Sequence, residues 1–405
     1  MHAVAEEAEP RGEARAAWWG PAGVLLAALG LTAITLRPQL VGIGPLVPAI
    51  QDDLALSHAV AGLLATIPVL CMGVLAPGAP AVLRVAGSRW AIAGSLALIA
   101  LGGLGRAVAP GPAVLLAGTA VVGMGIGLAG ALLPVVVKQG LPARPVLATA
   151  VYVFGMNLGA ASASAGAVPL ADATGGWRGT LLVFSLLTLA VLPAWLICTR
   201  RLPRVRGGAV APLRRAAGSQ LAWVLVGVFT FMSIAFYGMN AWLPDAYAER
   251  GWSEASAGAL VAVLNLCALP TTLLVPWLAD RRGARRTYLV TGTLGLTAAC
   301  VGFATVPALA FAWAVLFGAS IGSLFPLMMS LPVEVGRDPA GVGAVSGLML
   351  GVGYCVSAAA PVALGALRDL TGSFDATLWA IAASCALAVA CGRMLTVQRL
   401  ATGTV

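Results

Sequence analysis

Twelve long apolar stretches, separated by short polar segments, constrain this 405-residue chain more than any other feature. A helix needs roughly 20 apolar residues to cross the hydrocarbon core of a bilayer, and every stretch reaches that length. Only 10% of the residues are charged, whereas soluble domains carry about 25%. The sequence therefore excludes a soluble enzyme, a disulfide-rich secreted module and a disordered chain. The stretches are 20–48, 59–82, 89–108, 113–137, 146–171, 178–198, 220–244, 255–279, 287–306, 308–331, 341–366 and 376–395.

The basic residues alternate between crowded and sparse connections. If the N-terminus lies inside the cell, nineteen of the 24 Lys and Arg residues fall on inner segments. Four fall on outer segments, namely Arg106, Arg178, Arg250 and Arg368, and Arg37 lies within a span. Because cytoplasmic loops carry the excess of basic residues, the sequence predicts a multi-pass protein of the inner or plasma membrane with both termini cytoplasmic. The first 17 residues carry four Glu and two Arg, so they predict a polar tail rather than a cleaved leader.

The two halves of the chain repeat each other at an offset of 196 residues. A shared offset across several spans predicts two copies of a six-helix unit, and six is even, so both copies have the same orientation. The segment Thr199–Ser219, with six Arg and no acid, links them. We expect an all-α membrane protein with a tail (1–19), a six-helix bundle (20–198), a linker (199–219), a second bundle (220–395) and a tail (396–405). Matching pairs include Gly42 and Gly238, Pro48 and Pro244, Gly87 and Gly283, Arg89 and Arg285, and Gly155 and Gly351.

This layout resembles the major facilitator superfamily of secondary transporters. The most specific motif is Asp280-Arg281-Arg282-Gly283-Ala284-Arg285-Arg286, which is similar to the family's cytoplasmic loop motif. The resemblance implies a gating role for Asp280, Arg281, Arg285 and Arg286, and for Arg89 in the first-half copy. That copy has Arg84 where the motif has its Asp, so we expect the ionic contacts between helix ends at the inner gate to differ between the two halves. The resemblance also implies twelve helices in two parallel, pseudo-symmetric bundles around a central cavity.

Within the superfamily, the chain is similar to the cyanate permease and 2-nitroimidazole transporter group over residues 20–395. Four segments carry this similarity: Leu36-Arg37-Pro38, Gly44-Pro45-Leu46-Val47-Pro48, Ile67-Pro68-Val69-Leu70-Cys71 and Arg368-Asp369-Leu370-Thr371-Gly372-Ser373. The resemblance implies a small substrate, such as a cyanate-like anion or a weakly acidic nitroheterocycle.

Arg37 is the sharpest candidate for substrate binding. An Arg at the centre of a span costs about 2.5–3.5 kcal/mol on insertion scales and usually faces a cavity or a partner. The acids lie in tails, loops or helix ends, so no mid-membrane carboxylate is available as a counterion. The planar guanidinium suits an oxyanion. Alternatively, Arg37 snorkels outward or bonds exposed backbone carbonyls, because Pro38 cannot donate to the carbonyl of Ile34.

Other polar residues within the spans are further candidates. Thr230, Ser233, Tyr237 and Asn240 share one helical face, and Ser233 is the counterpart of Arg37. Asn157, Asn265 and Tyr354 lie near mid-membrane. We expect Ser233, Tyr237, Asn240, Asn157, Asn265 and Tyr354 to bind substrate with Arg37. For the polar face that carries Ser233, Tyr237 and Asn240, the alternative is hydrogen bonding between helices. The glycines of Gly123-x-Gly125-x-Gly127, together with Gly318 and Gly322, predict close helix packing.

These observations predict a transporter that works by alternating access on a small anionic solute contacted by Arg37. An exporter of a neutral nitroheterocycle-like compound is the alternative, followed by a non-transporting membrane sensor. No catalytic set, cofactor site or metal-ligand spacing appears among the seven cysteines or elsewhere, so we expect neither an enzyme nor a cofactor. We expect a monomer in the lipid bilayer with a small-molecule substrate and no nucleic acid.

Overall fold

The computed structural model describes residues 21–56, 58–200, 211–282 and 285–394. Over these ranges the chain is helical, without a β-strand. Eleven segments of the described chain are long and apolar enough to cross a membrane. One of them, Gly62–Ala107, has 46 residues, about twice the length that a 30 Å hydrocarbon core requires. Its backbone turns at Gly87, where φ is 70° and ψ is 162°, so this segment makes two crossings and the described residues make twelve.

The first bundle contains the helices up to Cys198, and its first crossing is interrupted. The elements are α2 (Pro21–Leu36), α3 (Pro38–Val41), η1 (Gly44–Leu46), α4 (Val47–Leu54), α5 (His58–Leu75), η2 (Ala76–Gly78), α6 (Ala79–Ala107), α7 (Pro112–Gly140), α8 (Pro145–Thr174) and α9 (Trp177–Cys198).

The second bundle begins after a short helix, α10 (Ala211–Ala217), which lies inside the segment predicted as a linker. Its first crossing, α11, is continuous, in contrast to that of the first bundle. The elements are α11 (Gln220–Glu249), α12 (Glu254–Arg282), α13 (Arg285–Thr305), η3 (Pro307–Leu309), α14 (Ala310–Val335), α15 (Pro339–Thr371) and α16 (Phe374–Arg393).

Glycines allow the helices of each bundle to approach closely. A Cβ on Gly127 would lie 2.6 Å from the Cα of Met72, and one on Gly125 would lie 2.6 Å from the carbonyl oxygen of Ser95. In the second bundle, a Cβ on Gly318 would lie 2.1 Å from the carbonyl oxygen of Leu264. The expectation that these glycines serve helix packing is confirmed. Lipid tails are as apolar as the side chains of the helices, so helices in a membrane associate through close packing, which small residues permit.

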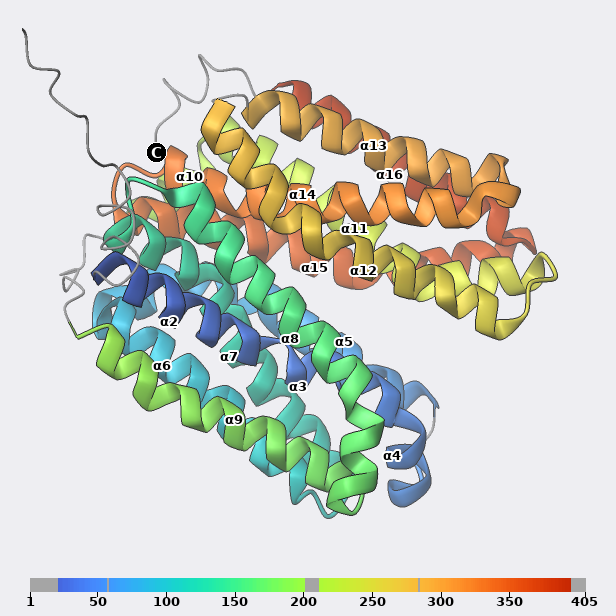
Figure 1. Ribbon diagram of the computed structural model, residues 1–405, viewed down its shortest axis with the longest axis horizontal. Coiled ribbons are helices and arrows are strands. Elements are labelled where there is room, and N and C mark those ends of the chain that lie inside the picture. Colours follow the sequence, from blue (N-terminus) through green and yellow to red (C-terminus); the bar gives the residue numbers. More distant parts are fainter. Residues whose placement is uncertain (1–20, 57, 201–210, 283–284, 395–405) are drawn as a thin grey trace, which may run out of the picture.

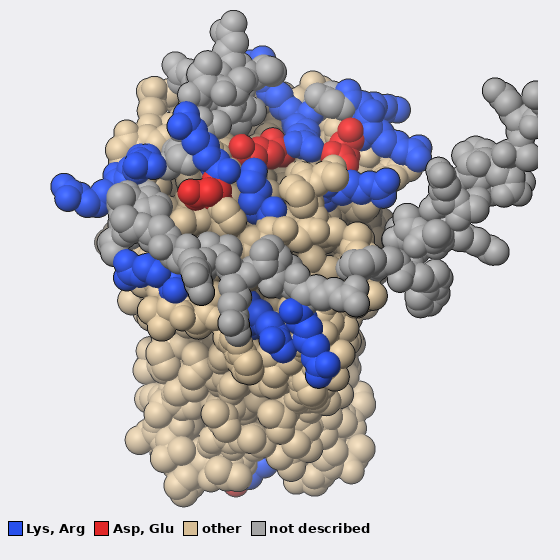
Figure 2. Space-filling model, turned by 90° about the vertical axis from the view of Figure 1, so that its left-hand side faces the viewer, with Lys and Arg blue, Asp and Glu red and all other residues tan. Residues whose placement is uncertain are grey.

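Basic side chains gather at one end of the molecule, which we call the basic end. Figure 2 looks onto this end and shows that Lys and Arg predominate there over Asp and Glu. The two bundles lie together at the basic end and diverge towards the opposite end (Figure 1). Helix ends and connections at the basic end supply Arg84, Arg89, Lys138, Arg144, Arg214, Arg215, Arg281, Arg285 and Arg337.

Contacts between the bundles run from the middle of the membrane to the basic end. Helix α5 and the following turn η2 pack on α15, where a Cβ on Gly347 would lie 2.6 Å from the carbonyl oxygen of Ala76 in η2. Lys138 of α7 donates a hydrogen bond to the carbonyl of Val333 on α14 at 3.1 Å. Near mid-membrane, Asn157 of α8 donates to the hydroxyl of Thr272 on α12 at 3.2 Å. The bundles are therefore joined at the basic end of the described structure.

Candidate functional site

The first crossing breaks where Arg37 stands. Helix α2 ends at Leu36, Arg37 has φ −96° and ψ −27°, and Pro38 begins α3. Pro38 has no N–H, so it cannot bond the carbonyl of Ile34. Helix α8 approaches this carbonyl so closely that a Cβ on Gly159 would lie 2.0 Å from its oxygen. The break therefore depends on Pro38 within the helix and on Gly159 beside it.

Arg37 reaches from this break towards the second bundle. The residue is half-buried, and the hydroxyls of Tyr237 on α11 and Tyr354 on α15 lie close enough to its guanidinium for electrostatic interaction. Its Nε is buried and has no hydrogen-bond partner among the described residues. None of the ion pairs within the described part of the chain includes Arg37. A cation of one bundle thus faces two hydroxyl groups of the other without a carboxylate.

A narrow cavity lies between the bundles next to this group. Tyr354 lines it, and the ring of Phe229 meets the ring of Tyr354 edge-on, with centroids 5.2 Å apart and planes at 89°. The remaining side chains are mainly apolar, so the cavity offers aromatic faces and few polar atoms. Its lining comprises Met72, Ile126, Gly127, Gly130, Tyr152, Met156, Phe325, Met329, Leu350 and Tyr354.

The predicted asparagines lie in hydrogen bonds between helices. Asn265 of α12 donates to the side-chain oxygen of Asn240 on α11 at 2.9 Å, and Asn240 donates to the carbonyl of Phe236 at 2.8 Å. Asn157 bonds Thr272 across the bundles. Ser233 is 5% exposed on α11. The structure thus brings Arg37, Tyr237 and Tyr354 together, whereas the three asparagines make hydrogen bonds between helices, the alternative weighed for Asn240.

The residues of the loop motif lie at the basic end of the second bundle. Arg285 pairs with Asp280 at 2.8 Å and also with Glu334 of α14. The guanidinium of Arg281 stacks 4.1 Å from the centre of the Trp277 ring, and Arg286 is exposed. The Arg285 pairs therefore join α12, α13 and α14.

The first-half copy of the motif is built differently. Arg89 donates to the carbonyl of Leu196 at 2.9 Å, and Trp195 donates to the carbonyl of Arg89 at 2.9 Å. Sequence reasoning missed Glu334 and its counterpart Lys138, which are 196 residues apart, like the other repeated pairs. Comparing the charges at the ends of 113–137 and 308–331 could have revealed them.

Arg106 corrects one sequence expectation. We expected it on an outer connection, but it lies in α6 and is 0% exposed. It donates to the carbonyl of Gln39, just beyond the break, at 2.7 Å. Gln39 is also 0% exposed, and its amide donates to the hydroxyl of Ser185 on α9 at 2.8 Å. The position of Arg106 within the apolar stretch 89–108 was the sequence signal for burial.

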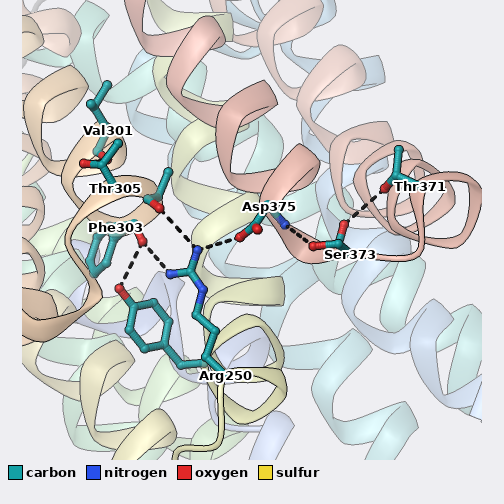
Figure 3. Close-up of polar contacts among 9 residues, drawn as sticks. Arg250, Val301, Phe303, Thr305, Thr371, Ser373 and Asp375 are labelled. Atoms are coloured by element: carbon teal, nitrogen blue, oxygen red, sulfur yellow. Dashed lines mark hydrogen bonds and ion pairs between the residues drawn. The ribbon is translucent and has the colours of Figure 1, made fainter.

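An ion pair joins the first and last crossings of each bundle at the end opposite the basic end. In the second bundle, Arg250 pairs with Asp375 at 2.7 Å and donates to the carbonyl of Phe303 at 2.7 Å (Figure 3). In the first bundle, Arg178 pairs with Asp53 and donates to the carbonyl of Ala109 at 3.0 Å. Both pairs span 125 residues of sequence, but the acid and the base have exchanged places.

In the described chain, twelve crossings in two bundles with a polar group between them have the architecture of a multi-pass membrane transporter. The family model of the Major Facilitator Superfamily matches residues 22–361 and 243–402, and the chain belongs to this family. The 2-nitroimidazole transporter of Escherichia coli is 32% identical over 367 residues, which cover 89% of this chain and 92% of that protein. The cyanate transport protein CynX of the same organism is 30% identical over 362 residues, covering 89% and 94%. The structure of the superfamily transporter FucP in its outward conformation matches with a TM-score of 0.76 at 16% identity, covering 93% of this chain and 99% of that one.

Proposed function

We propose that this protein carries a small anionic solute across the membrane by alternating access, with Arg37 as the residue that binds the anion. The observation that carries the proposal is the half-buried guanidinium, which faces Tyr237 and Tyr354 and forms no ion pair within the described chain. An unpaired charge at this depth is costly. An anionic substrate would supply the missing charge, and the tyrosine hydroxyls would donate further hydrogen bonds to it.

The geometry favours a small, flat anion. The guanidinium fork can hold two oxygens of one group side by side, and the adjoining cavity is narrow and lined by aromatic and aliphatic side chains. A cyanate-like ion or the conjugate base of a weakly acidic heterocycle combines these two properties. The names of the two relatives, a 2-nitroimidazole transporter and a cyanate transport protein, agree with this size class.

We further propose that the basic end is cytoplasmic and that the conformer described is closed on that side. The excess of basic residues supports the orientation. The contacts of Lys138 with Val333 and of α5 with α15 support the closure. Transport then requires these contacts to break while the opposite ends of the bundles come together. The Arg285 pairs with Asp280 and Glu334 hold the second bundle's helix ends together during this movement. In this proposal the protein functions as a monomer in the cell membrane.

No carboxylate contacts Arg37 in the described part of the chain, which limits how transport is coupled. Proton-driven transporters commonly use an ionisable residue within the membrane. Because the described residues place no carboxylate at this site, the proposal allows three modes of transport: uniport, exchange of two anions, or entry of the proton on the substrate itself.

Export of a neutral nitroheterocycle is the second candidate. The observation that favours it is the aromatic lining, in which Phe325 and Tyr354 both pack against the ring of Phe229 behind them. A neutral planar ring could stack there without using the charge of Arg37.

Thermal stabilisation and vesicle transport of the purified protein test the two candidates. Cyanate, 2-nitroimidazole and a neutral polar solute are compared on the wild type, Arg37→Gln and Arg37→Lys. Arg393→Gln, an exposed position at the end of α16, is the matched control. A ligand that binds only the folded state adds about 2.7 kcal/mol of stability at a hundredfold excess over Kd. Stabilisation and uptake that disappear in Arg37→Gln but persist in Arg393→Gln support the anion site. Equal responses of Arg37→Gln and the wild type overturn it and favour the neutral ligand.

A further inference from the structure

Arg106 is a second buried cation in the first bundle, and the proposed transport site does not include it. Its side chain is fully buried in α6, and no Asp or Glu pairs with it in the described ranges. Its Nε and one terminal nitrogen have no hydrogen-bond partner among the described residues. Burying a guanidinium without an acid is costly, so the one bond that it does make has to be considered.

Arg106 makes that bond to the short helix α3, which follows the break. Nη1 of Arg106 donates to the carbonyl of Gln39 at 2.7 Å, a length typical of a charge-assisted hydrogen bond. Gln39 is two residues after Arg37, and its side-chain amide donates to the Leu181 carbonyl at 3.2 Å and to the Ser185 hydroxyl at 2.8 Å, both on α9. Gln39 is therefore fixed between α6 and α9.

Two glycines make room for this arrangement. A Cβ on Gly118 would lie 2.8 Å from Cγ of Arg106, and a Cβ on Gly103 would lie 2.2 Å from the amide nitrogen of Gln39. A larger residue at either place would displace a side chain that holds the segment after the break. The Arg106–Gln39 contact is thus enclosed by α6, α7 and α9.

The second bundle provides an internal control. At the same offset of 196 residues, Gly302 stands in place of Arg106, Ala235 in place of Gln39 and Ser233 in place of Arg37. There, α11 continues unbroken from Gln220 to Glu249. The cation that interacts with the tyrosines, the break and the buried Arg occur together in one bundle and are absent together from the other over the described residues.

We propose that Arg106 is a positioning residue: by donating to the carbonyl of Gln39, it fixes the break in the first crossing and so places the Arg37 guanidinium towards Tyr237 and Tyr354. The inference rests on the proposed function, in which Arg37 binds the substrate. Arg106 itself touches no substrate and acts through the backbone between Arg37 and Gln39.

Hydrogen exchange of the purified protein in detergent measures the break directly. The amides of Leu40 and Val41 bond the carbonyl of Arg37 at 2.9 Å, and Gly42 bonds that of Pro38 at 3.0 Å, so a peptide covering 37–46 reports on this turn. In Arg106→Met, we expect this peptide to exchange about tenfold faster, because a charge-assisted bond is lost. We expect the peptides of α11 to keep their wild-type rates.

Arg250→Met is the matched control. Arg250 also donates to a backbone carbonyl, that of Phe303 at 2.7 Å, but it lies in the other bundle. Its loss should leave the 37–46 peptide unchanged. Wild-type exchange of that peptide in Arg106→Met, or faster exchange to the same extent in every helix, overturns the proposal. If Arg106→Met does not fold, Arg106→Gln decides, because its side chain is shorter and uncharged and so loses the charge-assisted bond to the Gln39 carbonyl. Faster exchange confined to 37–46 supports the proposal, and wild-type exchange in that variant overturns it.

Ligand binding separates this inference from the proposed function. Cyanate and 2-nitroimidazole are titrated against the wild type, Arg37→Gln, Arg106→Met and the double variant. If Arg106 acts through Arg37, Arg106→Met weakens anion binding in the wild-type background but not in the Arg37→Gln background. Equal weakening in both backgrounds overturns the positioning role while the anion site stands. Wild-type affinity in Arg37→Gln, with the 37–46 peptide still loosened in Arg106→Met, overturns the anion site but leaves Arg106 as the residue that fixes the break.

Discussion

The first crossings of the two bundles start from related sequences and end as different structures. In the first bundle, α2 stops at Leu36 and the chain restarts at Pro38, whereas α11 runs for 30 residues without interruption. The position of Arg37 is occupied by Ser233, which is 5% exposed in a packed helix. The two bundles thus share one arrangement of helices over the described residues. They differ at this position, which carries the unpaired charge of Arg37 in the first bundle and an uncharged Ser233 in the second. We therefore expect the two positions to differ in function.

The largest expected effect comes from removing the side chain of Arg37, and the matched comparison is removal of the Ser233 hydroxyl. Truncating one side of a buried charge contact costs about 2–5 kcal/mol, so Arg37→Ala should reduce uptake of the anionic substrate by about thirtyfold or more. Ser233→Ala removes only a hydroxyl and should reduce uptake by less than about tenfold. Uptake into vesicles checks both variants, and their melting temperatures show that each is folded. Equal losses at the two positions would contradict the asymmetry between the bundles.

The glycine beside the break should be less tolerant of substitution than a glycine on the same helix with free space around it. A Cβ on Gly159 would lie 2.0 Å from the Ile34 carbonyl, whereas Gly166 has nothing within 4 Å. Overpacking costs about 1–3 kcal/mol, while Gly→Ala in an open helical position gains up to about 1 kcal/mol. We expect Gly159→Ala to lower the melting temperature and Gly166→Ala to raise it slightly, as measured by thermal unfolding in detergent. A neutral Gly159→Ala would mean that α8 does not hold the break.

Much of the fold could be predicted because bilayer thickness and charge asymmetry act on the whole sequence. The twelve crossings and the central position of Arg37 followed from the lengths of apolar stretches and from one charge within them. The burial of Arg106 was missed because it lies near the end of its stretch, where charge counting assigns a residue to a connection. The bonds of Asn157, Asn240 and Asn265 depend on which helices face each other. The spacing of polar residues along one helix shows which face they share, but not which helix lies opposite that face.

The ends of α7 and α14 sharpen the comparison at the basic end. Lys138 and Glu334 occupy equivalent positions with opposite charges; Glu334 pairs with Arg285, and Lys138 reaches across to Val333. Both members of the Arg285–Glu334 pair are about a quarter exposed, at 27% and 23%. Hydrogen bonds to charged groups contribute about 1.5–3 kcal/mol, and partial exposure reduces this. We expect Glu334→Gln to lower stability by about 1 kcal/mol and to slow transport several-fold.

Lys138→Gln is the matched test of the cross-bundle contact. It removes one of the hydrogen bonds that join the two bundles but leaves the Arg285 pairs intact, so its effect should appear mainly in the transport rate. Spin labels placed at the basic ends of α7 and α14 would report the distance between the bundles. If Lys138→Gln leaves both the distance distribution and the rate unchanged, the contact has no part in closing this end.

The ion pairs at the end opposite the basic end should give the smallest effects. Asp53 and Asp375 are 45% and 66% exposed, and exposed pairs contribute about 0–1 kcal/mol. Asp53→Asn and Asp375→Asn should each change the free energy of unfolding by less than about 1 kcal/mol, with a weaker effect at high salt because exposed charges are screened. Arg250→Gln should cost more than either, because Arg250 also donates to the carbonyl of Phe303, which would lose this donor. Chemical unfolding at low and high salt compares the three variants. A salt-sensitive loss in Asp375→Asn as large as that in Arg250→Gln would show that the charge pair, rather than the bond to the carbonyl, joins the crossings of the second bundle.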